Sequence, residues 1–202
     1  MIEWINEKYT DLGTLSNLHR TFAGNLPFQH IFLADFLKEE KAEELRELLK
    51  KEEFEEKNSD LFQFKQTKDL SGSEGMKKFY GFLQGREFAE FMQKLTGITV
   101  IPSAIDVSGT LYENTDYLLC HDDQLEGRKI AYIFYLGDNL SEEDGGNFAL
   151  LSSDSGKPGK KIKKYPANFN GFMAFKVSKE SFHEVEEVIA EKKRYAIGGW
   201  LH

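Results

Sequence analysis

Hydrophobic and polar positions follow different periods in the two halves of the chain. In segment 38–54, apolar residues recur at the spacing of one helical face and the rest are mostly charged, which predicts an amphipathic helix. A second helix is predicted over 76–95, where apolar side chains gather on one side. Between these helices, apolar and polar residues alternate over 60–66, which predicts a strand.

After Pro102, short runs of β-branched and aromatic residues alternate with turn signals such as Lys157-Pro158-Gly159. Eight strands are predicted, at 104–112, 116–120, 128–136, 147–151, 161–165, 171–177, 183–188 and 194–201. Eight short strands at regular spacing are typical of a sandwich or a jelly-roll barrel.

The pattern as a whole predicts a mainly β fold with flanking N-terminal helices. We expect a double-stranded β-helix (jelly-roll, cupin-like barrel) at 103–202 and a helical support region at 1–102 that covers its outer face. No repeat and no linker divides the sequence, so we expect a single domain over 1–202.

Composition and charge narrow the classes of function. Hydrophobic residues make up 40% of the chain, enough for a buried core, and 26 basic against 34 acidic residues give a net charge of −8. An acidic protein is a poor partner for anionic lipid or phosphate backbones, so we expect no membrane and no direct nucleic-acid binding. Cys120 cannot form an internal disulfide, and segment 1–7 does not read as a signal peptide, so we expect a cytoplasmic protein.

One charge run departs from this acidic background. Segment 157–164 (KPGKKIKK) carries five lysines. It is interpreted first as a solvated hairpin, since charge runs are common on surfaces. The alternative is a basic edge that steers an acidic or nucleic-acid-bound partner.

Two histidines and one aspartate stand where they could share a metal ion. His121 and Asp123 are two residues apart at the end of a predicted strand, so their side chains are expected on one face. His183 begins the seventh predicted strand, which neighbours the second strand in a jelly roll. Two imidazoles and a carboxylate are the facial triad that non-haem Fe(II) oxygenases use. Each residue alone is more simply read as structural, and only the conjunction favours a metal site.

Arg194 opens the last predicted strand and shares a face with Ala196, Gly198 and Trp200. If this face is the inner one, the small residues leave room beside a buried guanidinium. A buried charge needs an opposite charge, and the guanidinium fork matches a carboxylate. The alternative is a surface arginine that follows the charged segment 191–193.

Several segments together resemble a known family. They are DYLLCHDDQLEGRKIAYIFYL at 116–136, SDLFQFKQTKDL at 59–70, PFQHI at 27–31, DGG at 144–146, HEV at 183–185 and RYAIGGW at 194–200. They resemble the 2-oxoglutarate and Fe(II)-dependent prolyl hydroxylases. The similarity is greatest to the ribosomal branch, whose members modify a decoding-centre protein of the small ribosomal subunit.

The resemblance implies roles for seven residues. Those that resemble the iron ligands, and hence the catalytic centre, are His121, Asp123 and His183. Those that resemble 2-oxoglutarate-binding residues are Arg194, for the distal carboxylate, and Tyr135 and Tyr112, which could instead be packed aromatics. Arg128 resembles an arginine near the substrate groove and could instead be a surface charge.

The resemblance also implies the reaction. We expect a dioxygenase that uses Fe(II), 2-oxoglutarate and O2, with ascorbate as reductant, and releases succinate and CO2. The expected substrate is a prolyl residue of a protein, with a small-subunit ribosomal protein in first place. The alternatives are the same chemistry on a free amino acid or other small molecule, and a barrel that binds without catalysis. Members of the ribosomal branch carry a second barrel-like domain after the catalytic one, whereas the resemblance here reaches only to His202. We therefore expect the docking role of that second domain to be missing or supplied by another molecule.

Overall fold

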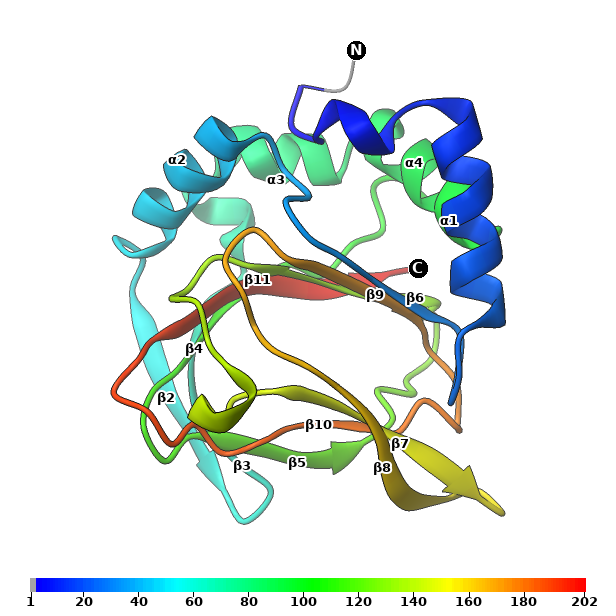
Figure 1. Ribbon diagram of the computed structural model, residues 1–202. Coiled ribbons are helices and arrows are strands. Elements are labelled where there is room, and N and C mark those ends of the chain that lie inside the picture. The colour runs from blue at the N-terminus through cyan, green and yellow to red at the C-terminus, as the bar shows by residue number, and fades with distance from the viewer. Residues whose placement is uncertain (1–2) are drawn as a thin grey trace.

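Helices dominate the first half of the chain and strands the second (Figure 1). The computed structural model describes residues 3–202. Residues 1 and 2 of segment 1–7, which the signal-peptide expectation concerned, lie outside the described residues. The helices are α1 (Leu12–Gly24), α2 (Glu39–Leu49), α3 (Lys77–Leu83) and α4 (Arg86–Thr96). The strands are β1 (His30–Leu33), β2 (Phe54–Ser59), β3 (Phe62–Thr67), β4 (Ser108–Tyr112), β5 (Tyr117–His121), β6 (Ile130–Tyr135), β7 (Phe148–Asp154), β8 (Lys157–Tyr165), β9 (Phe172–Lys176), β10 (His183–Val185) and β11 (Arg194–Leu201). Among the described residues, no helix combines the length and apolar character that a membrane crossing needs.

The strands form one antiparallel sheet that folds over on itself. Its order is β1-β9-β6-β11-β4-β3-β5-β10-β7-β8, with β2 paired to β3. Strands β9, β6 and β11 lie above β5, β10 and β7 in Figure 1, and β3 connects the two layers. At the opposite side the edge strands β1 and β8 approach each other, where the Tyr165 hydroxyl lies 2.8 Å from His30 Nε2. The predicted jelly-roll barrel with N-terminal helices is confirmed.

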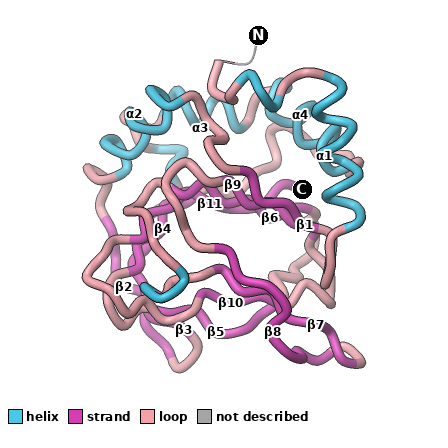
Figure 2. The backbone as a smooth tube through the Cα atoms, in the orientation of Figure 1, coloured by secondary structure: helices cyan, strands magenta, loops and turns pink. Residues whose placement is uncertain are grey.

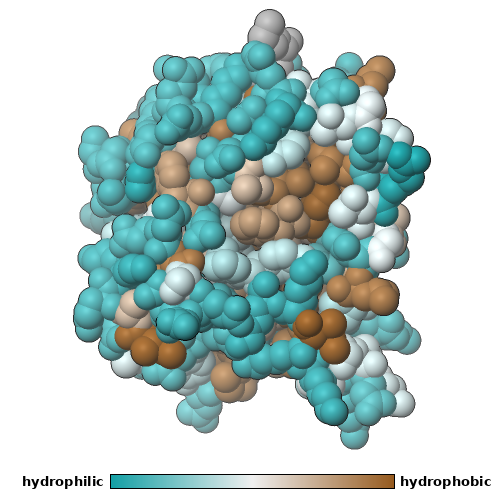
Figure 3. Space-filling view, in the orientation of Figure 1, coloured by the Kyte–Doolittle hydropathy of each residue, from teal (hydrophilic) through white to brown (hydrophobic). Residues whose placement is uncertain are grey.

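The helices cover one sheet of the barrel, as Figure 2 shows. An aromatic cluster fills the space between them. Phe134 of β6 lies 5.2 Å from Phe79 of α3, and Phe172 of β9 stacks on Phe36 at 4.1 Å (ring centroids). Figure 3 shows brown hydrophobic surface between this layer and the lower strands, surrounded by hydrophilic side chains. The expected support of the barrel by N-terminal helices therefore has a physical basis in this apolar layer.

A second apolar cluster lies between the two layers of strands. It includes Tyr112, Tyr135, Phe148, Phe175 and Ala196, all buried. These side chains come from five different strands and point into the barrel. Tyr112, Phe148 and Phe175 line the cavity described below, and the face of β11 that carries Arg194 and Ala196 is the inner one.

All eight strands predicted for the second half of the chain are present, and only some of their predicted first and last residues differ from those observed. The predicted turn at Lys157-Pro158-Gly159 is wrong, since these residues begin β8. The chain turns earlier, at Ser155 and Gly156, whose φ angles are 54° and 79°. Two consecutive left-handed residues match a two-residue hairpin turn, which the stronger-looking Pro-Gly pair concealed.

More was missed in the first half. The predicted helix 38–54 ends at Leu49, and its last residue, Phe54, starts β2. The predicted helix 76–95 is two helices, because Gly85 leaves helical conformation (ψ 156°) and caps α4. Helix α1 and strand β1 were not predicted. Tertiary packing decides these short elements more than local pattern does.

The aromatic layer yields a stability prediction. Replacing Phe134, which is 1% exposed, with Ala should lower the free energy of unfolding by about 3–5 kcal/mol, because the cavity left by a core phenylalanine refills poorly. Urea denaturation measures this change. Leu61→Ala, at a side chain that is 63% exposed, is the matched control and should have little effect. Equal losses in both variants would contradict the assigned core.

Candidate metal and carboxylate site

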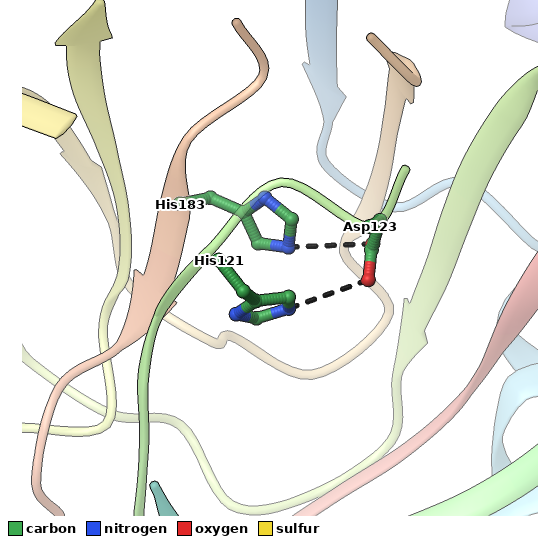
Figure 4. Close-up of side chains that lie close together, drawn as sticks. All are labelled: His121, Asp123 and His183. Carbon is green, nitrogen blue, oxygen red and sulfur yellow. Dashed lines mark ion pairs between the residues drawn. The ribbon is translucent and has the colours of Figure 1, made fainter. Parts of the chain in front are cut away.

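Two paired strands bring the two histidines together. His121 ends β5 and His183 begins β10, and the two residues are direct partners in the antiparallel register. Their rings lie 4.2 Å apart (centroids). Asp123 Oδ1 lies 3.3 Å from His121 Nε2, and Asp123 Oδ2 lies 3.4 Å from His183 Nε2 (Figure 4). One ligand atom from each residue lies within 4.8 Å of the other two, so the three could hold one metal ion.

Asp123 reaches this position by a route different from the expected one. Strand alternation predicted that His121 and Asp123 share a face, but β5 ends at His121. Asp123 has a φ of 62°, so the chain turns through the left-handed region, which aspartate adopts more readily than most residues. This turn directs the carboxylate back toward both imidazoles.

Backbone carbonyls orient both imidazoles. His121 Nδ1 donates to the Leu119 carbonyl at 2.8 Å, and His183 Nδ1 donates to the Ser181 carbonyl at 2.7 Å. With Nδ1 protonated, Nε2 of each neutral ring is free as a ligand, which is the arrangement usual for metal-binding histidines. Phe175 packs against the His183 ring at 4.6 Å and further restricts it.

The electrostatics favour an ionised carboxylate at the centre of the cluster. Burial alone would raise the pKa of Asp123, but hydrogen bonds from His121 and His183 outweigh it and hold this pKa well below its usual range. Burial lowers the pKa of His121, and the hydrogen bond to Asp123 more than compensates, so it is raised overall. A metal ion would take the place of the imidazole protons beside Asp123.

A second buried charge faces the same cavity. Arg194 is 2% exposed, and its Nε donates to the Gly146 carbonyl at 3.0 Å. Its Nη2 and the Tyr135 hydroxyl are buried without a hydrogen-bond partner among the described residues. The guanidinium carbon lies 4.9 Å from the Tyr112 ring centroid and 5.1 Å from that of Tyr135. A buried cation with an unused donor and no carboxylate beside it fits the carboxylate of a bound ligand.

Both tyrosines remain neutral in this environment. Burial raises the pKa of Tyr135 to about 12, although Arg194 opposes the shift. Burial also raises the pKa of Tyr112 strongly. The hydroxyl of Tyr135 is therefore a hydrogen-bond donor at neutral pH. It can donate to the same ligand oxygen that Arg194 attracts.

One cavity of about 170 Å³ contains both groups. His121, Asp123, His183, Arg194 and Tyr112 all line it, while Tyr135 borders it through the Arg194 side chain. The residues present would therefore suit a divalent metal, held by an ionised aspartate and two oriented imidazoles, and a ligand carboxylate, held by the Arg194 guanidinium. The expected cluster of ligand residues is brought together by the fold.

Further residues line the cavity that the sequence did not single out for a role. They are chiefly Phe64, Gln66, Leu118, Ile133, Phe148 and Trp200. Phe64 of β3 stacks on Tyr112 at 5.0 Å. Two features of the sequence could have indicated these lining residues: the alternation over 60–66 and the shared face of Arg194 and Trp200. Neither shows which strand lies opposite, so neither could assign a wall of the cavity.

Arg128 lies beside the cavity and does not line it. Its guanidinium carbon sits 3.3 Å from the Trp200 ring centroid, and its Nε is 4.0 Å from Asp106 Oδ2. Nη1 also points to the Asp123 carbonyl at 3.5 Å. A plain surface charge does not describe this position, and the expected place near a substrate groove stays a prediction. The side chain is a half-buried cation held against an indole at the edge of the cavity.

Comparison with solved structures shows the same fold at low sequence identity. A Pseudomonas putida prolyl-4-hydroxylase superposes with a TM-score of 0.70 at 14% identity, covering 93% of this chain and 98% of that one. A Trichoplax adhaerens prolyl hydroxylase, solved with a hypoxia-inducible-factor peptide fragment, gives 0.72 at 16% identity, covering 96% and 94%.

Comparison with curated sequences gives higher identity. Prolyl 3-hydroxylase OGFOD1 of Xenopus laevis is 39% identical over 88% of this chain and 35% of its own length. Prolyl 3-hydroxylase sudestada1 of Drosophila melanogaster is 32% identical over 100% of this chain and 40% of its own length. The chain thus spans about a third of the curated relatives it matches. The model of the 2OG-Fe(II) oxygenase superfamily matches residues 107–202, which contain all three clustered ligand residues and Arg194. Residues 107–202 of the chain therefore form a 2OG-Fe(II) oxygenase domain.

Proposed function

We propose that this protein is a 2-oxoglutarate- and Fe(II)-dependent dioxygenase that hydroxylates a prolyl residue of a protein substrate. One observation carries the proposal. The His121, Asp123 and His183 cluster and the unpaired Arg194 guanidinium open into the same buried cavity. The relatives named prolyl 3-hydroxylase support the choice of proline.

The residues of the cavity divide the work of binding. His121, Asp123 and His183 would hold Fe(II) through two imidazole nitrogens and a carboxylate. When bound, iron with 2-oxoglutarate and O2 supplies the oxidising power for C–H hydroxylation, and succinate and CO2 are released. Arg194 neutralises the distal carboxylate of 2-oxoglutarate and Tyr135 donates to it, while Tyr112 forms the wall beside them. We propose ascorbate as the external reductant that keeps the iron in the ferrous state.

The rest of the cavity suits an apolar substrate group. Phe64, Leu118 and Trp200 offer carbon surface near the metal cluster, which fits a pyrrolidine ring better than a charged side chain. Arg128 contacts this wall through Trp200. Its proposed part in substrate binding is to hold that indole in place at the edge of the cavity.

The proposed substrate is a small-subunit ribosomal protein, and the proposed location is the cytoplasm. The support is the resemblance of segments 27–31 and 59–70 to the ribosomal branch. The second segment contributes β3, whose Phe64 and Gln66 line the cavity. Two residues of one segment that resembles the ribosomal branch therefore line the proposed site.

The metal role of His183 has a direct test. His183→Ala should weaken Fe(II) binding by at least about 100-fold, because loss of a ligand exceeds the cost of losing a residue that only orients one. Fe(II)-dependent succinate formation should be lost with it. Isothermal titration under anaerobic conditions and a succinate assay measure the two effects. His19→Ala, on α1 and outside the cavity, is the control, and undiminished turnover by His183→Ala would refute the ligand role.

Binding of 2-oxoglutarate by Arg194 can be tested separately from binding of Fe(II) by the three ligand residues. Arg194→Ala should raise the KM for 2-oxoglutarate by at least about 30-fold, which corresponds to about 2 kcal/mol for a buried charge pair. Fe(II) affinity should change little. Arg86→Ala, at an exposed arginine on α4, is the matched control. A variant that loses iron and 2-oxoglutarate binding equally would point to misfolding and contradict the assignment.

Mass spectrometry tests the substrate. Ribosomes from a strain that lacks this protein are incubated with the protein, Fe(II), 2-oxoglutarate and ascorbate. An added oxygen atom on a proline of a small-subunit protein is expected, and it should be absent with His183→Ala. If 2-oxoglutarate is turned over but no ribosomal proline gains oxygen, the ribosomal substrate is wrong and the dioxygenase assignment stands.

A further inference from the structure

The β7–β8 hairpin extends beyond the level of the His121, Asp123 and His183 side chains. His183 pairs with Leu150 of β7, and Leu150 pairs with Lys163 of β8. One residue further on, Leu151 N–H donates to the Phe182 carbonyl at 2.9 Å. From there to the turn, β7 and β8 pair with each other, at Ser153–Pro158 and Asp154–Lys157. In Figure 1 this arm projects at the lower right, on the side toward which β5 runs as it ends at His121.

The outer edge of the arm is free. Strand β8 is the last in the sheet order, so it has a strand neighbour on one side only among the described residues. Pro158 lies within it, and proline is accommodated in an edge strand because no N–H is needed on the open side. All side chains from Lys160 to Lys164 are exposed. The segment 157–164 of β8 is called the basic arm below.

Acidic neighbours neutralise only part of the basic arm. Lys161 Nζ lies 2.5 Å from Glu184 and 2.8 Å from Glu186, and Lys164 Nζ lies 2.8 Å from Glu186. The other three ammonium groups have no carboxylate partner within the described residues 3–202. They belong to Lys157, Lys160 and Lys163, which follow one another at three-residue intervals along the strand. Of these, Lys163 Nζ also lies 4.9 Å from the Tyr165 ring centroid.

This arrangement fits a phosphate backbone. Lysine ammonium groups act as strongly hydrated point charges, which neutralise phosphates without base recognition. The arm has no arginine fork for bidentate carboxylate pairing and no exposed aromatic ring for stacking on unpaired bases. Its lysines also discourage pairing with another strand. An extended peptide added to the β8 edge is therefore less favoured than the backbone of a folded RNA.

The net charge of −8 does not oppose this local contact. At physiological ionic strength, charges more than about 8 Å apart are largely screened. A phosphate beside the arm therefore interacts with the arm's lysines more than with the acidic residues elsewhere on the chain. Of the acidic residues near the arm, Glu184 and Glu186 are paired with Lys161 and Lys164, and Asp154 lies opposite Lys157. The expectation of no direct nucleic-acid binding rested on the net charge of the whole chain, whereas the alternative of a basic edge rested on segment 157–164 alone.

We propose that the basic arm contacts the phosphate backbone of RNA that borders the prolyl segment entering the cavity. This inference rests on the proposed ribosomal substrate, because a protein within the ribosome presents its prolines beside RNA. Lys157, Lys160 and Lys163 make the contacts. The arm positions the RNA-bound substrate at the cavity and takes no part in hydroxylation.

Binding of a labelled, short RNA duplex, measured by fluorescence anisotropy over a range of salt concentrations, tests the proposal. The triple variant Lys157→Gln, Lys160→Gln and Lys163→Gln should bind at least about 10-fold more weakly than the unmodified protein. The slope of log affinity against log salt should fall by about 2 to 3 units, as expected for three lost phosphate contacts. The control triple variant Lys51→Gln, Lys78→Gln and Lys94→Gln removes the same charge from exposed sites, one in the turn after α2 and one each on α3 and α4, and should retain the affinity.

Three outcomes would overturn the proposal: no RNA binding by the unmodified protein, equal losses in both triple variants, or binding of poly-glutamate in preference to RNA. The last would assign the arm to an acidic protein segment. The assay does not depend on turnover, so His183→Ala should bind RNA like the unmodified protein. A failure of the hydroxylase proposal therefore leaves this test interpretable.

Discussion

The site depends on the pairing of β10 with β5. These strands are separated by more than sixty positions in the chain, and their register places His183 directly opposite His121. A shift by one residue would turn one imidazole to the outer face and destroy the cluster. The turn at Asp123 then adds the carboxylate at the end of the same strand. The clustering of these three side chains is thus a consequence of strand register and one residue in the left-handed conformation.

The other half of the cavity is held by a different part of the fold. Arg194 and Tyr135 lie on β11 and β6, which the aromatic layer of Phe134, Phe172 and the N-terminal helices supports from outside. Strand β3 passes between the two layers and carries Phe64 to the cavity. The helical region therefore acts on the site indirectly, through the sheet that carries the carboxylate-binding residues.

The cavity is bordered by polar groups that find no hydrogen-bond partner among the described residues. A buried guanidinium nitrogen and a buried phenol have no partner among the described residues, and each such group costs free energy in the folded state. An anionic ligand that binds there recovers this free energy. Outside the cavity, Lys161 and Lys164 of β8 pair with Glu184 and Glu186, while the other lysines of the arm have no carboxylate partner among the described residues.

The sequence by itself determined the eight strands of the barrel and the residue types of the candidate metal site, because period-two alternation and short motifs are local properties. It left open whether the face of β11 that carries Arg194 points inward. It did not reveal α1, β1 or β2, whose stability comes from packing against other elements. Only the tertiary structure decided that Phe64 faces Tyr112, that Arg128 lies on Trp200, and that the lysines of β8 stand on a projecting arm. These facts depend on which strands become neighbours, and contacts between distant segments leave no periodic signal in the chain.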